Sequence, residues 1–182
     1  HPEDLLRWLR SMYQRRRPLS YALPWLTFDA TREIAGRLRP GARVFEFGSG
    51  HSTPYWAELG AEVYSVEDHA GWFELVKQRL AAHPRAQVFF EPEQAGYLGR
   101  IEQVGGMFDM VLVDGSHRKE CLAPAIRHLK PGGLLVVDNT DWHWFDDVDT
   151  HVPKQWQRLT FNGWAPFIGH RSETSMWVGP SQ

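Results

Sequence analysis

Acidic, glycine and hydroxyl residues follow several short apolar runs of this chain, each at the point where the run ends. They lie at 46–50, 67–68, 91–93, 114–117 and 138–141. If the runs are parallel strands of one sheet, their carboxyl ends meet at one edge, which is where such sheets bind ligands. Carboxylates gathered there repel one another, so we expect a cationic or hydroxyl-rich ligand, or a metal ion, at this edge.

The Gly-Ser-Gly segment at 48–50 directly follows the apolar run at 43–47. Glycines let a ligand approach the backbone closely. A phosphate-binding G-x-G-x-x-G fingerprint needs a third glycine, where this chain has Thr53. Glu46 before the glycines disfavours a pyrophosphate and suits a ligand with an amino group and a sulfonium. Glu67, about 20 residues later, is placed to accept hydrogen bonds from both hydroxyls of a ribose, which favours an adenosine-bearing cofactor.

Strand-like and helix-like patterns alternate along the chain and must position these residues. Strands are expected at 43–47, 63–66, 87–90, 108–113 and 134–137, and helices at 27–38, 53–59, 72–80 and 121–129, with a stop at 130–133. Alternation of this kind predicts an α/β fold, a Rossmann-like, doubly wound, mainly parallel sheet. Segments 156–161 and 174–178 add an antiparallel C-terminal hairpin.

The chain has 182 residues, which suits one domain at 25–182 behind an N-terminal basic helix or extension at 1–24. The arginines of that extension indicate either a nucleic-acid or membrane patch or the solvated face of a docking helix, and we favour the docking helix. A net charge of −2 gives no general attraction to nucleic acid, and no apolar run reaches the roughly 18 residues of a membrane span. Cys121 has no second cysteine to pair with, which fits a reducing, cytoplasmic location.

Four segments in order resemble the motifs of class I S-adenosylmethionine (SAM)-dependent methyltransferases. Residues 44–50 are similar to motif I, 63–67 to the acidic motif that follows, and 108–117 and 129–139 to the later motifs. The Gly-Ser-Gly-x-Ser-Thr and Val-Asp-Gly-Ser-His forms resemble a bacterial branch that includes sugar O-methyltransferases of antibiotic biosynthesis and cephalosporin-hydroxylase-like proteins. The resemblance covers residues 25–140.

The resemblance implies a SAM site along these strand ends. Glu46 and the glycines would line the methionine part of SAM, and Glu67 would bind the ribose. Asp68, Trp72 and either Glu91 or Pro92 would lie near the adenine, and Asp114 near the methionine amino group or a metal. The implied cofactor-binding residues are Glu46, Gly48, Ser49, Gly50, Glu67, Asp68, Trp72, Glu91 and Asp114. Trp25 and Thr27 would close over the cofactor from the preceding segment.

Two routes to activating the acceptor stay open. Metal-dependent O-methyltransferases similar to the catechol type carry an Asp after strand four and an Asp-Asp or Asp-Asn pair after strand five. Asp114, Asp138 and Asn139 match that arrangement here. These oxygen ligands would suit Mg²⁺ or Ca²⁺ rather than Zn²⁺, and the metal would lower the pKa of an attacking hydroxyl. The Gly-Ser-His after Asp114 departs from that type, so His117 is the alternative catalytic residue, as a general base. The expected acceptor is an oxygen of a small molecule, a phenol or sugar.

Other interpretations compete with these assignments. Asp138 and Asn139 would serve a turn if no metal binds. The aromatic loop 142–144 forms either a substrate lid or a cover for the sheet edge, and residues 92–106 receive no role. A non-catalytic SAM-binding or partner-docking module and a nicotinamide-dependent oxidoreductase are the alternative functions. The chain lacks an Asn-Pro-Pro-Tyr motif, so we do not expect it to methylate adenine nitrogens of nucleic acid. Exposed residues among its nine Trp would favour a homodimer.

Overall fold

The computed structural model describes residues 2–14 and 23–181. Its helices are α1 (Pro2–Gln14), α2 (Phe28–Arg37), α3 (Ser52–Glu58), α4 (Ala70–Leu80), α5 (Gln94–Val104) and α6 (Arg118–Arg127), with short 3₁₀ turns η1 (His143–Phe145) and η2 (Val148–Thr150). Its strands are β1 (Arg43–Phe47), β2 (Glu62–Glu67), β3 (Ala86–Phe90), β4 (Phe108–Val113), β5 (Leu129–Asp138), β6 (Gln157–Trp164) and β7 (Arg171–Val178).

The strands form one sheet in the order β3-β2-β1-β4-β5-β7-β6. Strands β1 to β5 pair in parallel, and β7 pairs antiparallel with both β5 and β6. The predicted doubly wound, mainly parallel α/β fold with an antiparallel C-terminal hairpin is therefore confirmed. Because the chain winds outward in both directions from the neighbouring strands β1 and β4, the switch point lies between them, where ligands of such sheets bind.

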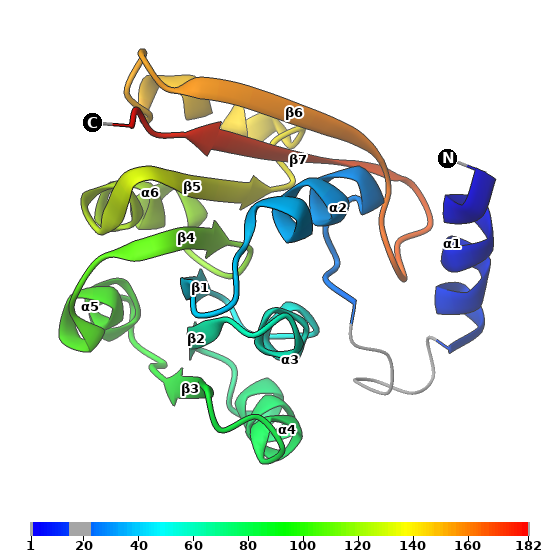
Figure 1. Ribbon diagram of the computed structural model, residues 1–182, viewed down its shortest axis with the longest axis horizontal. Coiled ribbons are helices and arrows are strands. Elements are labelled where there is room, and N and C mark those ends of the chain that lie inside the picture. The colour runs from blue at the N-terminus through cyan, green and yellow to red at the C-terminus, as the bar shows by residue number, and fades with distance from the viewer. Residues whose placement is uncertain (1, 15–22, 182) are drawn as a thin grey trace.

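Helices cover both faces of the sheet (Figure 1). One core packs α2, α3 and α4 against the sheet through Ile34, Trp56 and Val76. The other packs α5 and α6 through Ile101 and Leu122. Strand β4 is apolar along nearly its whole length because its side chains face both cores.

Two differences from the predicted bounds lie on either side of the β4–β5 connection. Helix α6 begins at Arg118 rather than at residue 121, because His117 adopts a left-handed conformation (φ 52°) and closes the turn after β4 at once. Residues 130–133, predicted to end that helix, form the irregular first part of β5 instead. The earlier start of α6 matters for function, because it places the first side chain of the helix beside the ends of β4 and β5.

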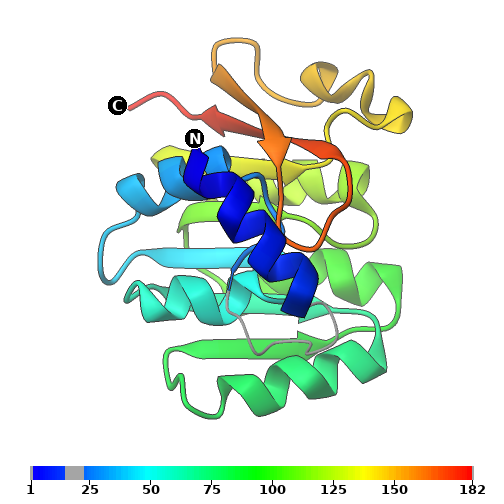
Figure 2. The ribbon, with the colours of Figure 1, turned by 90° about the vertical axis from the view of Figure 1, so that its right-hand side faces the viewer.

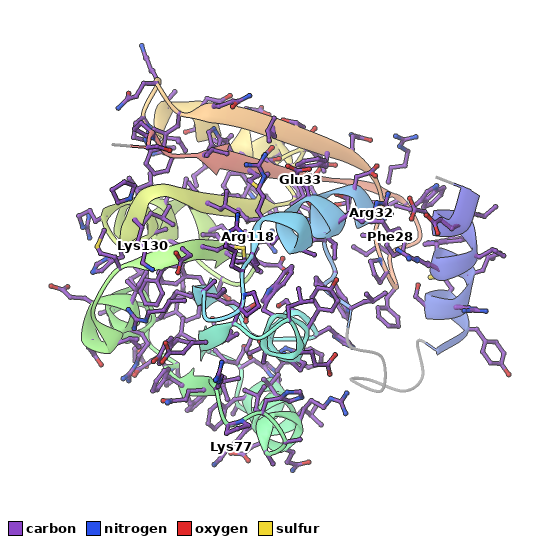
Figure 3. The ribbon with its side chains drawn as sticks, in the orientation of Figure 1. Phe28, Arg32, Glu33, Lys77, Arg118 and Lys130 are labelled. Atoms are coloured by element: carbon purple, nitrogen blue, oxygen red, sulfur yellow. The ribbon has the colours of Figure 1, made fainter. Side chains whose placement is uncertain are left out.

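Helix α1 packs beside the turn that joins β6 and β7 (Figure 2). The Trp8 indole donates to the Ile168 carbonyl at 2.8 Å, and the Trp8 and Trp164 rings lie 4.9 Å apart. Asp4 receives two hydrogen bonds from Arg32 of α2, and Figure 3 labels that arginine between the two helices. Arginines 15–17 of the predicted basic extension lie outside the described residues. None of the helices in the described ranges combines the length and the apolar character that a membrane crossing requires.

Candidate functional site

A cavity of about 710 Å³ lies at the carboxyl ends of β1, β4 and β5. Its walls are the segment 48–52 after β1, the ends of β4 and β5, and the β6–β7 turn at 167–170. Trp25, Trp72 and Trp142 complete the lining. The volume falls within the roughly 300–1,000 Å³ that small-molecule pockets occupy. The cavity is therefore where the sequence predicted a ligand.

Gly48 stands where the turns after β1 and β4 touch. Its φ is +98°, and a Cβ added there would lie 2.6 Å from the backbone N and Cα of Gly115. The Gly48 amide donates to the Val66 carbonyl at 3.0 Å, and the Asp114 amide to the Phe47 carbonyl at 3.0 Å. Only glycine fits this contact, so the glycine segment is fixed by its neighbours as well as being open to a ligand.

Glu46 lies in the core and not among the cavity-lining residues. Its carboxylate accepts hydrogen bonds from the hydroxyls of Thr53 and Ser65, both at 2.6 Å, and from the Trp56 indole at 3.0 Å. Burial raises the pKa of Glu46, and these donors oppose that rise. The structure thus places Glu46 beneath the glycine segment, where it anchors α3 to β1 and β2.

Glu67 and Trp72 both hold Ser49. One carboxylate oxygen of Glu67 accepts from the Ser49 amide at 3.1 Å and from its hydroxyl at 2.9 Å, and the other accepts from the His69 amide at 3.0 Å. The Trp72 indole donates to the Ser49 carbonyl at 2.5 Å. Ser49 and Trp72 line the cavity as expected, whereas Glu67 supports its wall.

Asp68 and Glu91, expected beside the adenine, do not line the cavity either. Asp68 follows β2 and is half-buried. Glu91 is paired with Arg100 of α5, and its amide donates to the Glu67 carbonyl at 2.8 Å. Both lie on the β2–β3 side of the sheet edge, so a ligand would reach them only by extending from the cavity across the end of β2.

Four rings form one aromatic wall of the cavity. The Trp25 ring lies 5.1 Å from His51, 5.7 Å from Phe167 and 6.2 Å from Trp72. Burial, helped by the charge of Arg79, lowers the pKa of His51 to about 4, so its ring is neutral at neutral pH. Trp25 thus reaches the cavity as the resemblance implied, while Thr27 is buried, with its amide bound to the Thr174 hydroxyl at 3.1 Å.

Polar groups from the ends of β4 and β5 form the opposite wall. Asp138 is buried and accepts from the Thr174 hydroxyl at 2.5 Å. Asn139 is left-handed (φ 57°) and donates to the Ser172 hydroxyl at 2.9 Å. Burial raises the pKa of both Asp114 and Asp138, and the nearby Asp114 charge raises the pKa of Asp138 further. The structure therefore brings together the three residues that were predicted to bind a metal.

A guanidinium occupies that wall, however. Arg118, labelled in Figure 3, donates to the Asp114 carboxylate at 3.1 Å and to the Asn139 side-chain oxygen at 2.9 Å. The described residues contain no group of three or more His, Cys, Asp or Glu side chains placed to hold a metal ion. Two of the three predicted ligands therefore already contact a cation, and the expected Mg²⁺ is not supported.

His117 and the loop 142–144 complete the comparison with the sequence. His117 is exposed, packs its ring 5.9 Å from that of Tyr97 and does not line the cavity, so the structure gives no support to it as a general base there. Trp142 does line the cavity, with the Arg118 guanidinium 5.4 Å from its ring centroid. Trp144 packs edge-on against Trp142 at 4.7 Å and is 48% exposed.

Arg118, His51 and the β6–β7 turn had no predicted role. Arg118 follows the Asp-Gly-Ser-His segment directly, and its place at the start of a helix was the missing signal. His51 lies within the glycine motif itself. Phe167 and His170 come from a turn with no motif, and only the fold brings them to the cavity.

The arrangement of the sheet has a clear match among solved structures. A SAM-dependent O-methyltransferase from Thermotoga maritima superposes with a TM-score of 0.64 at 12% identity, covering 94% of this chain and 72% of that one. The fold is that of class I SAM-dependent methyltransferases. In this fold the cavity occupies the edge where the glycine segment and the ends of β4 and β5 meet.

Sequence comparison finds methyltransferases too. No family model matches the chain. A protein-L-isoaspartate O-methyltransferase of Methylorubrum populi is 36% identical over 104 residues, 55% of this chain and 46% of that protein. Demethylmacrocin O-methyltransferase of Streptomyces fradiae is 26% identical over 127 residues, 65% of this chain and 32% of that protein. The chain thus spans less than half the length of these two relatives.

Proposed function

We propose that this chain is a SAM-dependent methyltransferase that transfers a methyl group to an oxygen of a small molecule. The observation that carries the proposal is the cavity at the switch point, bounded by the Gly-Ser-Gly segment and the ends of β4 and β5. The class I fold and the methyltransferase relatives support it. We assign the activity to residues 25–182, with residues 1–24 as an extension.

The cavity residues fit SAM. A Cβ added at Gly50 would point toward Trp72, 3.6 Å from its indole nitrogen, so a side chain there would fill space beside the glycine segment. The backbone of residues 48–50 would hold the methionine part of SAM, and the rings of Trp25 and Trp72 offer faces that attract a cation. When bound, SAM supplies an electrophilic methyl group on its sulfonium sulfur.

Asp114 is our candidate for the proton acceptor. It lines the cavity, and burial raises the pKa of its carboxyl while the charge of Arg118 opposes that rise. A raised pKa makes a carboxylate a stronger general base. In the proposed reaction the Asp114 carboxylate would take the proton of the acceptor hydroxyl as that oxygen bonded to the methyl carbon. The bond between the methyl carbon and sulfur would break, and S-adenosylhomocysteine would leave. Trp142 and the aromatic wall keep water from the reacting atoms. No step uses His117, because its side chain does not reach the cavity.

Calorimetric titration with SAM, S-adenosylhomocysteine and NADH tests the cofactor. We expect one S-adenosylhomocysteine site per chain and no binding of NADH. Trp72→Ala should weaken binding, since it removes both a cavity wall and the hydrogen bond to Ser49. Trp144→Ala is the matched control, because that indole is exposed and does not line the cavity. Binding of NADH alone, or of neither cofactor, would overturn the proposal.

Asp114→Asn separates two roles for this carboxylate. If it accepts the proton, turnover should fall about 100-fold or more while the affinity for S-adenosylhomocysteine stays unchanged. If the affinity for S-adenosylhomocysteine falls as much as turnover does, Asp114 instead binds the amino group of the cofactor. A separate assay identifies the methyl acceptor. Phenols, sugars and an isoaspartyl peptide are each supplied as the acceptor, and the S-adenosylhomocysteine released is measured. Turnover of the peptide alone would refute the small-molecule acceptor and leave the methyltransferase assignment standing.

A further inference from the structure

We propose that the guanidinium of Arg118 is the resident cation of this sheet edge and takes the place that a divalent metal would hold between Asp114 and Asn139. The inference concerns the protein in the absence of any ligand, so it stands apart from the methyl acceptor and from the cofactor.

The five N–H groups of the guanidinium have acceptors on the two strand ends. Nε donates to the Gly115 carbonyl at 2.9 Å. One terminal nitrogen donates to the Asp138 carbonyl at 2.6 Å and the Asn139 side-chain oxygen at 2.9 Å. The other donates to the carbonyl and the carboxylate of Asp114, both at 3.1 Å. An arginine has five such donors and no acceptor, so every hydrogen-bond donor of this side chain has a partner within the protein.

Two of the three side chains that were predicted to bind Mg²⁺, Asp114 and Asn139, therefore already accept hydrogen bonds from a cation. The third, Asp138, accepts from the Thr174 hydroxyl and offers only its backbone carbonyl to Arg118. Mg²⁺ needs oxygens at about 2.0–2.1 Å in octahedral geometry. Here the Asp114 carboxylate and the Asn139 side-chain oxygen face N–H groups, and a metal ion among them would meet a positive charge. The arginine is always protonated. Trp142 lies 5.4 Å from the guanidinium carbon, and the Arg118 side chain is only 15% exposed.

The guanidinium also links two segments of the chain, as a bridging metal ion would. Its acceptors come from the segments after β4 and after β5, which it joins across the cavity wall. With its donors engaged within the protein, Arg118 is a positioning residue: it sets where the Asp114 carboxylate lies. Its place in the first turn of α6 couples that helix to both strand ends.

Electron paramagnetic resonance titration with Mn²⁺ alone tests the proposal. The wild-type protein should leave Mn²⁺ free, and a chelator should leave its melting temperature unchanged. Arg118→Ala uncovers the oxygens and should bind one Mn²⁺ per chain, and that binding should be lost in the Arg118→Ala/Asp114→Asn double variant. Arg127→Ala is the matched control, because it removes an exposed arginine from the last turn of the same helix.

Two outcomes would overturn the inference. One is a wild-type protein that binds one Mn²⁺ in a manner abolished by Asp114→Asn. The other is a folded Arg118→Ala variant that binds none. If Arg118→Ala does not fold, Arg118→Lys replaces it. That variant keeps one charge but loses the planar set of donors, so it should melt at a lower temperature and still bind no Mn²⁺. Uptake of Mn²⁺ by the lysine variant would count against the proposal.

Discussion

Single residues at this sheet edge are held by several partners each, and Ser49 shows how. Its amide and hydroxyl donate to Glu67, and its carbonyl accepts from Trp72. The neighbouring Gly48 has no side chain to hold, but its backbone lies against Gly115. The shape of the cavity floor therefore depends on residues whose side chains face away from the cavity as well as on those that line it.

Gly48→Ala should destabilise the whole protein. The new Cβ would lie 2.6 Å from backbone atoms of Gly115, and the residue would keep a φ of +98°. Strain of this kind costs about 1–3 kcal/mol before any clash is counted. Chemical unfolding measures the loss. Gly99→Ala in α5 is the control: its Cβ meets no atom within 4 Å, and the helix should gain up to about 1 kcal/mol. If the Gly48 variant were as stable as the wild type, the close approach of Gly48 to the Gly115 backbone would be contradicted.

His51 should make the protein less stable as the pH falls. Its pKa in the folded protein is about 4, because of burial and the charge of Arg79, against about 6.5 when unfolded. Below pH 6.5 the unfolded chain binds a proton that the folded one rejects, so stability falls until about pH 4. The loss attributable to this residue is about 2 kcal/mol at pH 5.

His51→Phe keeps the ring contacts with Trp25 and Phe167 but cannot titrate. The difference in unfolding free energy between wild type and this variant, followed from pH 7 to pH 4, isolates the effect from that of the buried carboxyls. Parallel curves would show that the His51 pKa is not lowered in the folded protein.

At the scale of elements, α1 holds the turn that carries Phe167 to the cavity. The Phe167 amide donates to the Ser11 hydroxyl at 3.0 Å, and the Trp8 indole donates to the next carbonyl of the turn. Phe167 is left-handed (φ 63°), which is unfavourable for a bulky residue unless its surroundings enforce it. The N-terminal helix thus braces a cavity wall from outside.

Ser11→Ala should loosen that wall. The buried Phe167 amide would lose its acceptor, at a cost of about 1–3 kcal/mol. We expect faster hydrogen exchange at this amide and, if the proposed function holds, weaker binding of S-adenosylhomocysteine. Leu9→Ala on the exposed face of α1 should change neither. Unchanged exchange in Ser11→Ala would mean that α1 does not brace the turn.

The helices and strands could be predicted well from the sequence, but the turns that connect them and the contacts between them could not. Strands β1 and β4 match their predicted bounds because each is a continuous buried run. The start of α6 was missed because it depends on the left-handed His117, a backbone choice with no pattern in the sequence. The contacts of Glu46 were not predicted, because nothing in the neighbouring sequence shows that Thr53, Ser65 and Trp56 converge on it.

At the scale of the whole molecule, the sheet depends on β7, the last strand in the sequence. Strand β7 lies between β5 and β6 and carries Met176 and Trp177 into the two cores. The topological rule for parallel sheets correctly placed the cavity, because it needs only the order of strands. The same rule says nothing of the antiparallel hairpin, so the cavity residues on the β6–β7 turn required the structure.

Removal of residues 157–182 should abolish cooperative unfolding, because β5 would lose β7, its partner on one side, and both cores would lose apolar side chains. Removal of residues 1–22 should leave a cooperative transition, since α1 contacts mainly the β6–β7 turn and α2. Differential scanning calorimetry of the two truncated chains measures this. A sharp transition in the chain lacking 157–182 would show that the sheet folds without its hairpin.

The reversed direction of β7 also decides how the protein can be attached to a surface. Val178 lies beside Leu134, at the end of β5 away from the cavity, and the Gly132 amide donates to the Pro180 carbonyl at 3.0 Å. Figure 1 shows this end of the chain on the opposite side from α1. A sensor chip or fluorescent label linked after Ser181 therefore leaves the cavity mouth open, whereas a label on α1 would lie against its wall.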